Sequence, residues 1–324
     1  MQHRVLGQTG LSVPGIMLGG NVFGWTLNES DSFRILDSAF DAGLSFIDTA
    51  DIYSTWVPGN TGGESETIIG KWFARTGKRN QVTIATKVGM DMGGGRKGLA
   101  GKYIEQAVDD SLRRLQTDRI DLYQSHEDDP TVRLEETLGT FAMLIQKGKV
   151  RYIGASNYSG ARLKLALETS KRTGVVRYQT LQPHYNMMER EPYESDLAPV
   201  VAEYGLGVIP YFSLASGFLT GKYRTEADLQ GRARGGGAGK YLNAHGRAVL
   251  AALDTVAAEY GSTPARVALA WLMTRPGVVA PISSATSVEH VTDLVEATKL
   301  QLARASLDQL NAASVPPASR AATV

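Results

Sequence analysis

The chain has 324 residues, of which 43% are hydrophobic and 21% charged, and this length and composition are typical of one large globular domain. Its 34 basic and 33 acidic residues leave a formal net charge of +1, which favours neither nucleic acid nor an anionic membrane as a partner. Because the chain contains no cysteine, disulfides, thiolate catalysis and cysteine-ligated metals are excluded.

The amino terminus, MQHRVLGQTG, lacks the charged and then apolar pattern of a signal peptide. No apolar run approaches the roughly 20 residues of a membrane-spanning helix. We therefore expect a cytoplasmic protein.

Short β-branched runs alternate along the chain with longer segments of helical periodicity, which indicates parallel βαβ units. Ahead of the first run, residues 3–13 (HRVLGQTGLSV) predict a β-hairpin around a Gln-Thr-Gly turn. The predicted strands are residues 16–18, 44–48, 82–87, 120–125, 152–156, 180–183, 208–211 and 278–282. Amphipathic segments with Ser, Asp or Gly near an end predict helices at residues 30–43, 102–116, 134–149 and 159–174.

Eight strand-and-helix repeats predict an α/β fold, a (β/α)8 TIM barrel whose amino-terminal hairpin seals its bottom, in a single domain over residues 1–324. Two long glycine-rich connections, residues 54–65 and 223–245, follow the second and seventh strands, on the side where barrel enzymes keep their active sites. Residues 313–324 predict a flexible tail.

An open doubly wound sheet would show the same alternation of strands and helices. Its dinucleotide-binding fingerprint, GxGxxG, should follow the first strand, where this chain has LGGNVFG. The later glycine-rich run at residues 234–239 does not stand between a strand and a helix. We therefore favour the barrel.

Polar side chains follow the predicted strands where several of them end. Asp48 and Tyr53 follow the second strand, Lys87 ends the third and His126 follows the fourth, so a barrel would bring all four to one mouth. Carbonyl reduction needs a hydride and a proton, and a phenol is protonated at neutral pH. We assign Tyr53 as the proton donor, with Lys87 lowering its pKa and Asp48 holding the lysine charged. His126 would orient the carbonyl oxygen.

Each of these side chains has an ordinary alternative when taken alone. Asp48 could be a satisfied buried carboxylate, Tyr53 a core aromatic residue and Lys87 a surface lysine. His126 precedes Glu127, Asp128 and Asp129, but consecutive residues point in divergent directions and make a poor metal site, so we predict no metal. The agreement of several strand ends favours the catalytic interpretation.

The segments that carry these residues resemble the aldo-keto reductases over nearly the whole chain, from RVLGQTGLSV through FIDTADIY, GGESETIIG, ATKVG, DLYQSH, VRYIGASNYS, LQPHYN and PYFSLASGFLTGKY to SSATSVEHV. The resemblance implies a cytoplasmic oxidoreductase that reduces a small aldehyde or ketone to the alcohol, with Asp48, Tyr53, Lys87 and His126 as catalytic tetrad. It implies NADP(H) as the preferred cofactor and NAD(H) as the alternative.

The same resemblance implies a set of cofactor contacts. Ser156, Asn157 and Gln182 would hold the nicotinamide carboxamide, and Tyr211 would stack on the ring. The pyrophosphate would lie on the backbone of Ser213, Leu214 and Gly217, below the cations Lys222 and Arg232 of the long loop, which also holds Arg234. Further contacts are predicted at Gly20, Asn21, Ser284, Thr286 and His290, and Trp25 and Trp56 are predicted to line the substrate pocket.

The chain departs from the family pattern at three places. Phe212 replaces the Ser of the family's Tyr-Ser-Pro-Leu motif. Thr286 occupies a position where many members have Arg or Lys, and Leu294 occupies one where Asn is common. The basic residue grips the adenosine 2'-phosphate, so its absence weakens the expectation of NADP(H) over NAD(H). Nothing in the sequence indicates the physiological substrate or the oligomeric state.

Two other functions suit a barrel of this kind. Some relatives of this fold bind a nicotinamide cofactor as slow sensing subunits of membrane channels, but no docking face stands out in the sequence and the complete tetrad favours an enzyme. A sugar isomerase or lyase would need a cluster of metal-binding carboxylates at the strand ends, which these strands do not supply.

Overall fold

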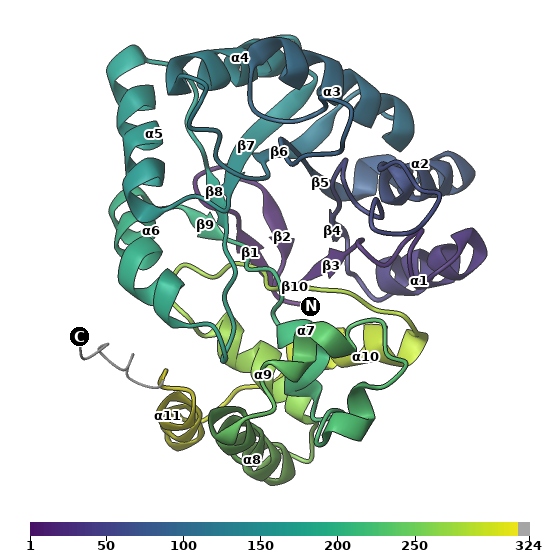
Figure 1. Cartoon of the computed structure of the whole chain (residues 1–324), viewed down its shortest axis with the longest axis vertical. Coiled ribbons are helices and arrows are strands. Elements are labelled where there is room, and N and C mark those ends of the chain that lie inside the picture. The colour runs from purple at the N-terminus through teal and green to yellow at the C-terminus, as the bar shows by residue number, and fades with distance from the viewer. Residues whose placement is uncertain (317–324) are drawn as a thin grey trace.

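The computed structural model describes residues 1–316, and its helices and strands are labelled in Figure 1. The strands are β1 (His3–Val5), β2 (Ser12–Pro14), β3 (Met17–Gly19), β4 (Phe46–Asp48), β5 (Thr83–Val88), β6 (Ile120–Ser125), β7 (Val150–Ser156), β8 (Thr180–Gln182), β9 (Gly207–Val208) and β10 (Ile282–Ser283). The α-helices are α1 (Glu29–Asp41), α2 (Glu64–Thr76), α3 (Gly101–Leu115), α4 (Leu134–Gln146), α5 (Gly160–Thr173), α6 (Ala198–Tyr204), α7 (Gly235–Gly239), α8 (Ala244–Glu259), α9 (Pro264–Met273), α10 (Val288–Ala297) and α11 (Arg304–Ala313). The remaining short helices are η1 (Lys78–Gln81), η2 (Tyr193–Leu197), η3 (Ala215–Thr220) and η4 (Glu226–Leu229).

Eight parallel strands form one curled sheet in the order β10-β3-β4-β5-β6-β7-β8-β9. Backbone hydrogen bonds also join the two end segments, since Val208 donates to Gly277 over 2.9 Å and Val279 donates to Val208 over 2.8 Å. Figure 1 shows the strands in the middle of the molecule with helices around them. This arrangement confirms the (β/α)8 fold, and the open doubly wound sheet is wrong.

Two strands are shorter than predicted. The seventh was expected at residues 208–211 and the eighth at residues 278–282, whereas β9 ends at Val208 and β10 begins at Ile282. Pro210 and Pro281 lie in the lost parts, and a proline has no N–H to donate to a neighbouring strand. The other six predicted strands agree with the observed ones to within two residues at either end.

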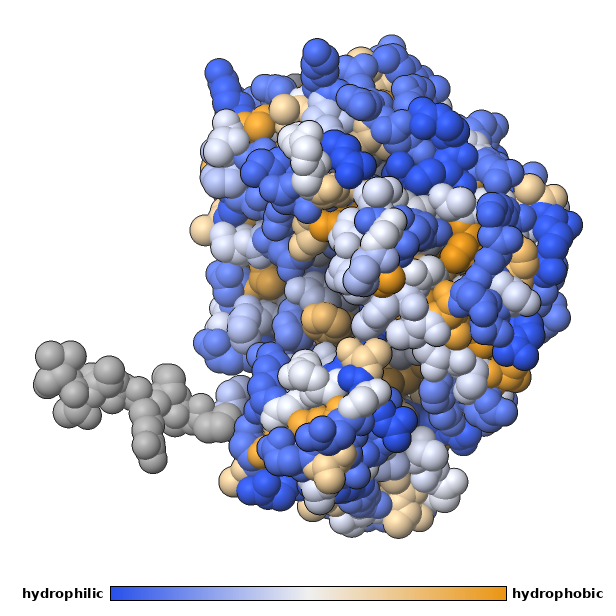
Figure 2. All heavy atoms as spheres, turned by 45° about the vertical axis from the view of Figure 1, so that its right-hand side comes forward, coloured by the Kyte–Doolittle hydropathy of each residue, from blue (hydrophilic) through white to orange (hydrophobic). Residues whose placement is uncertain are grey.

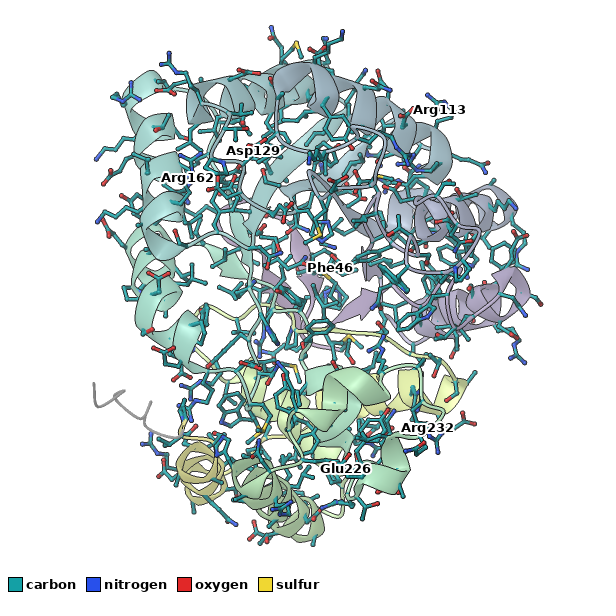
Figure 3. The ribbon with its side chains drawn as sticks, in the orientation of Figure 1. Phe46, Arg113, Asp129, Arg162, Glu226 and Arg232 are labelled. Carbon is teal, nitrogen blue, oxygen red and sulfur yellow. The ribbon has the colours of Figure 1, made fainter. Side chains whose placement is uncertain are left out.

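The hairpin β1–β2 closes the bottom of the barrel, as predicted. Its residues Leu6, Leu11 and Val13 are buried in one cluster with Phe46, which Figure 3 shows in the middle of the barrel. At Gly7 a Cβ atom would lie 2.4 Å from the carbonyl oxygen of Gln179 and 2.9 Å from the backbone nitrogen of Gly207, and its φ is +55°. Because these two residues directly precede β8 and open β9, the hairpin lies at the amino-terminal ends of the strands.

Several helices around the barrel begin at a residue whose side chain caps them, although α2, α3 and α4 do not. The Asn28 side chain accepts from the backbone of Asp31 at the start of α1, and Ser159 accepts from Arg162 at the start of α5. Thr263 caps α9, whose first residue is Pro264. The apolar faces of these helices pack on the outside of the strands in the larger buried cluster. The four predicted helices are therefore confirmed.

The two long connections differ in structure. Residues 54–63 contain no helix, and α2 begins at Glu64, inside the predicted connection. Residues 223–245 were expected as one loop, but they contain η4 and α7 and the first two residues of α8. At Gly235 a Cβ atom would lie 2.2 Å from the carbonyl oxygen of Leu229, so the glycine lets α7 pack directly on η4.

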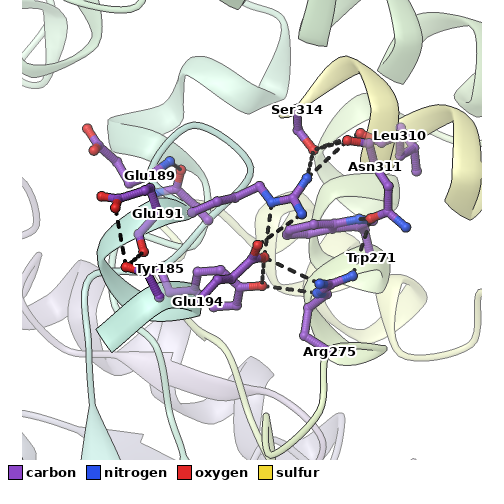
Figure 4. A network of polar contacts seen from close by, with 12 residues as sticks. Tyr185, Glu189, Glu191, Glu194, Trp271, Arg275, Leu310, Asn311 and Ser314 are labelled. Atoms are coloured by element: carbon purple, nitrogen blue, oxygen red, sulfur yellow. Dashed lines mark hydrogen bonds and ion pairs between the residues drawn. The ribbon is translucent and has the colours of Figure 1, made fainter. Parts of the chain in front are cut away.

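A polar network fixes the end of α11 to the barrel (Figure 4). Arg190 pairs with Glu194 at 3.0 Å and donates to the Ser314 hydroxyl over 2.9 Å. The indole of Trp271 donates to the Asn311 side chain over 2.8 Å. Ser314 is fully buried and Ala313 ends α11, so these two residues do not belong to a loose tail. The last residues of the predicted tail, 317–324, lie outside the described part of the chain.

The described surface is largely polar. Figure 2 shows one face on which most side chains are hydrophilic and hydrophobic residues form smaller patches. No helix within residues 1–316 is long and apolar enough to cross a membrane.

Candidate active site

A cavity of about 920 Å³ opens at the carboxyl ends of the strands, where the parallel topology directs the side chains that follow each strand. Asp48 ends β4, His126 follows β6, and both line the cavity. Tyr53 also lines it, from the connection after β4, where its backbone N–H turns back to the carbonyl of Ala50. Lys87 comes from β5 and lies behind this wall, fully buried. The structure therefore brings the four predicted catalytic residues together.

A tight set of hydrogen bonds joins three of them. The Tyr53 hydroxyl donates to the Asp48 carboxylate over 2.8 Å. Lys87 Nζ lies 2.8 Å from both Asp48 oxygens, 2.8 Å from the Thr49 carbonyl oxygen and 2.8 Å from Tyr53 Oη. Gln182 Nε2 donates to the other side of Asp48 over 3.0 Å. The Asp48 carboxylate is thus a satisfied buried group as well as the partner of the lysine.

The pKa of Tyr53 moves in the direction opposite to the expected one. Burial raises it well above 10, and the charge of Asp48 and the hydrogen bond to Asp48 raise it further. Burial likewise lowers the pKa of Lys87, against the opposing effect of Asp48. The net shift is upward because desolvation and the adjacent carboxylate dominate, so the predicted lowering of the phenol pKa is not the net outcome at this site. Tyr53 therefore keeps its proton through the neutral range.

His126 is held as a neutral imidazole beside the phenol. Its ring centroid lies 6.1 Å from that of Tyr53, and the side chain is 7% exposed. Burial, and then the charge of Lys87, lower its pKa well below 6.5. Its Nδ1 is buried and has no hydrogen-bond partner within residues 1–316. A neutral imidazole in this place can meet an oxygen atom in the cavity through Nε2 without adding a charge.

The predicted carboxamide contacts lie side by side on the cavity wall. Ser156, at the end of β7, donates to the carbonyl oxygen of Gln182 over 2.8 Å. Asn157 has a left-handed φ of 54°, and its side-chain nitrogen donates to the carbonyl oxygen of His126. The Tyr211 hydroxyl donates to Asn157 Oδ1 over 2.7 Å, which places the ring of Tyr211 along the cavity. These residues are brought together as expected.

The segment after β9 has an unusual backbone. Ala215, Ser216 and Gly217 have φ values of 49°, 56° and 87°, three consecutive residues in the left-handed region. Successive N–H groups in such a turn form a concavity that suits an anion. Lys222 stands next to it, since a Cβ atom on Gly217 would lie 3.3 Å from Lys222 Nζ. The predicted residues of this segment, Ser213, Leu214, Gly217, Lys222 and Arg232, all line the cavity.

The far end of the cavity carries the remaining predicted contacts. Ser284 donates to Asn21 Oδ1 over 2.5 Å, and Thr286 Oγ1 lies 3.1 Å from His290 Nδ1. Thr286 and His290 are exposed at the cavity edge. Asp293 lies there too and pairs with Arg266 at 2.8 Å.

Three predicted site residues do not line the cavity. Gly20 packs behind it, where a Cβ atom would lie 2.8 Å from the carbonyl oxygen of Asp48. Trp25 packs edge-on against Trp56 at 5.6 Å between ring centroids, and Trp56 alone of the two reaches the cavity. Lys87 acts from behind Asp48 and Tyr53.

Sequence reasoning missed part of the lining. Among the residues that it did not name are Val22, Thr26, Met90, Tyr223, Thr263 and Asp293. Tyr223 follows Lys222 directly and could have been included with it. Thr263 caps α9 and Asp293 lies on α10, and neither differs in the sequence from an ordinary cap or surface residue.

Two of the acidic residues after His126 form contacts with other parts of the barrel. Asp128 pairs with Arg162 at 2.9 Å, and Asp129 accepts from the backbone of Leu99 over 2.9 Å. Within residues 1–316, no three histidine or acidic side chains are grouped as metal ligands.

Known proteins resemble this chain over nearly its whole length. Residues 15–315 match the family model described as the Aldo/keto reductase family. The chain is 36% identical to the "Uncharacterized oxidoreductase YrpG" of Bacillus subtilis, over 96% of this chain and 95% of that protein. It is 35% identical to the "Aldo-keto reductase YhdN" of Bacillus subtilis, over 86% of this chain and 82% of that one. It is 31% identical to the "Probable voltage-gated potassium channel subunit beta" of Oryza sativa, over 92% of this chain and 91% of that protein.

Proposed function

Because the chain belongs to the aldo/keto reductase family, we propose that it reduces an aldehyde or ketone to the alcohol, with a nicotinamide cofactor and with Tyr53 as the proton donor. One observation carries the proposal. The Tyr53 hydroxyl lines the cavity while it contacts both Asp48 and the fully buried Lys87. A protonated phenol at the cavity wall, backed by a cation, can release its proton to an oxygen atom in the cavity.

The cavity fits a nicotinamide dinucleotide. The left-handed turn at residues 215–217 and the adjacent Lys222 and Arg232 would hold its pyrophosphate, and neither cation pairs with a carboxylate in the described part of the chain. Ser156, Asn157 and Gln182 offer polar atoms for the carboxamide, and Tyr211 an aromatic face for the ring. When bound, the cofactor supplies the hydride.

The residues of this chain would supply the proton and orient the substrate. The carbonyl oxygen replaces Asp48 as the acceptor of the Tyr53 hydroxyl and meets the imidazole of His126. As the carbonyl carbon gains the hydride, the proton of Tyr53 Oη passes to the carbonyl oxygen, and an alcohol results. The charge left on Tyr53 then lies 2.8 Å from Lys87 Nζ, and solvent later returns a proton.

For the cofactor we propose NADP(H) as the preferred form, with NAD(H) as a weaker alternative. Ser284, Thr286 and His290 offer hydrogen bonds for the adenosine 2'-phosphate at the far end of the cavity. The positions of Ser284, Thr286 and His290 carry no arginine or lysine. Arg234 reaches Asn21 beside Ser284, at 3.4 Å, and the carboxylate of Asp293 also lines this end. The preference should therefore be modest.

A second function is a binding subunit that senses the nicotinamide cofactor with slow turnover. The observation that favours it is the similarity to a protein named as a voltage-gated potassium channel beta subunit. The complete set of Asp48, Tyr53, Lys87 and His126 favours the enzyme.

The test is the loss of near-ultraviolet absorbance of reduced cofactor with a panel of aldehydes, ketones and sugars, run with NADPH and NADH in parallel. The enzyme predicts multiple turnovers with at least one carbonyl compound. Tight cofactor binding with no more than one turnover on the whole panel would favour the sensing subunit instead.

A further inference from the structure

Arg234 places a positive charge at the mouth of the cavity. It precedes α7, lines the cavity and is partly buried. Its guanidinium carbon lies 5.6 Å from the ring centroid of Trp25, and Nη2 lies 3.4 Å from Asn21 Oδ1. The tryptophan face and the neutral amide hold the guanidinium in place, and neither carries a charge.

The charges around the cavity leave this arginine without an anion. Of the two acidic residues in the lining, Asp48 pairs with Lys87 and Asp293 with Arg266. Within residues 1–316, Arg234 forms no ion pair with a carboxylate. Burial also lowers the pKa of Arg234, because the surroundings withdraw it from water without supplying a negative charge. An anionic oxygen would relieve this imbalance.

Arg234 lies on the side of the cavity that faces Tyr53. Trp25, under the guanidinium, packs on Trp56 at 5.6 Å, and Trp56 packs on Tyr53 at 6.2 Å. Arg234 is also the cation whose charge counteracts the raised pKa of Tyr53. Lys222, in contrast, stands at the left-handed turn around Gly217. Burial, and then the charges of Arg234 and Arg232, lower the pKa of Lys222, so Arg234 is also near the cation of the turn. Arg234 therefore lies between the turn and the aromatic residues next to Tyr53.

We propose that Arg234 binds an anionic oxygen group of the substrate, so that the preferred substrates are aldehydes or ketones that carry a carboxylate. The aromatic surface of Trp56 and Phe212, which are 47% and 46% exposed, would contact the carbon skeleton between the two ends. This inference rests on the proposed carbonyl reduction. A cofactor phosphate offers the same anionic oxygens, so the test separates the two sources.

The test compares para- and meta-carboxybenzaldehyde with their methyl esters, which keep the ring and the aldehyde but lack the charge. Arg234→Gln is the variant, and Arg232→Gln, two residues earlier on the same loop, is the matched control. The unmodified protein should show a higher kcat/KM for at least one acid than for its ester. Arg234→Gln should lower kcat/KM for that acid roughly 10- to 100-fold, mainly through KM, because it removes a charge-assisted contact.

The same variant should leave two quantities nearly unchanged, the kcat/KM of the ester and the Kd of NADPH. Arg232→Gln should instead weaken NADPH binding and change kcat/KM for the acid and the ester to the same extent. If Arg234→Gln weakens NADPH binding and lowers kcat/KM equally for the acid and the ester, the guanidinium binds the cofactor and the proposal is wrong. Equal use of acid and ester by the unmodified protein would also overturn it.

A binding measurement keeps this inference separate from the proposed reaction. Titration of benzoate and benzamide into the NADP⁺-loaded protein should show tighter binding of benzoate, lost in Arg234→Gln and kept in Tyr53→Phe. A protein that shows this selectivity but reduces no carbonyl compound would contradict the proposed function and leave the anion site standing. Equal affinity for benzoate and benzamide would contradict the anion site whatever the activity.

Discussion

The ammonium of Lys87 lies 2.8 Å from the hydroxyl oxygen of Tyr53, and the lysine side chain is fully buried. Solvent and salt therefore screen this charge very little. The phenol is protonated in the absence of substrate, because burial and Asp48 raise its pKa. In catalysis Lys87 acts when negative charge develops on the phenol oxygen, and in the resting fold it pairs with Asp48.

Tyr53→Phe should abolish most of the activity and leave the cofactor bound. The substitution removes the proton donor but keeps the ring that packs against Trp56 and His126. General acid catalysis contributes a factor of about 10² to 10⁴, so kcat should fall by at least that range. Tyr103, whose ring lies outside the cavity lining, gives the control Tyr103→Phe. Near-normal kcat in Tyr53→Phe would remove the phenol from the mechanism.

Lys87→Met should lower kcat strongly and destabilise the fold. It leaves the Asp48 carboxylate buried without its cation, and breaking a buried ion pair from one side costs about 3–5 kcal/mol. Denaturant unfolding measures the stability, and steady-state kinetics measure the rate. Lys97→Met, at a lysine that is 63% exposed, is the control and should change neither.

The double variant Asp48→Asn with Lys87→Met separates stability from catalysis. It removes both charges, so much of the lost stability should return because no uncompensated charge stays buried. Activity should stay low, since the phenol still lacks its cation. Recovery of both stability and activity in the double variant would mean that Lys87 serves the fold alone.

The barrel and the meeting of the strand ends could be predicted from the sequence, because hydrophobic periodicity and parallel topology together determine where each strand ends. Asp48, Lys87 and His126 are strand-end residues of this kind. The shortening of β9 and β10 could also have been predicted, because Pro210 and Pro281 lie inside the predicted strands.

The loop residues could not be placed in this way. The position of Arg234 over Trp25 depends on how α7 packs on η4, which joins residues far apart in sequence. The predicted direction of the Tyr53 pKa shift differed from the net observed one for a related reason. The sequence indicates which charges are near, but the cost of desolvation depends on how completely the site is buried.

Asp51 is a second buried carboxyl near the site, and it gives a prediction about stability. It is 1% exposed, and neither carboxyl oxygen has a hydrogen-bond partner in the described chain. Burial, and then the charge of Glu66, raise its pKa to about 8, against the opposing charges of Arg114 and Lys87. In the unfolded chain the pKa should be near its ordinary value of about 3.9.

Between these two values the folded protein holds a proton on Asp51 that the unfolded chain lacks. The free energy of unfolding should therefore fall as the pH rises, by about 1.4 kcal/mol per pH unit from this group. Asp51→Asn removes that contribution, so the variant should gain stability over the unmodified protein between about pH 5 and about pH 8. Asp110→Asn, on the surface of α3, is the control. A stability difference that stays constant with pH would show that Asp51 is ionised in the fold.

Thr286→Arg should shift the cofactor preference. Thr286 is exposed at the far end of the cavity, 3.1 Å from His290 and near the carboxylate of Asp293. An arginine at position 286 would add a positive charge at the exposed edge of this end. A charge-assisted contact to a phosphate contributes roughly 1.5 to 3 kcal/mol, so NADPH should bind about 10- to 100-fold more tightly while NADH changes little. Calorimetric titration of both cofactors measures this, with Thr292→Arg on the exposed side of α10 as control. Equal gains for NADPH and NADH would show that position 286 does not face the 2'-phosphate.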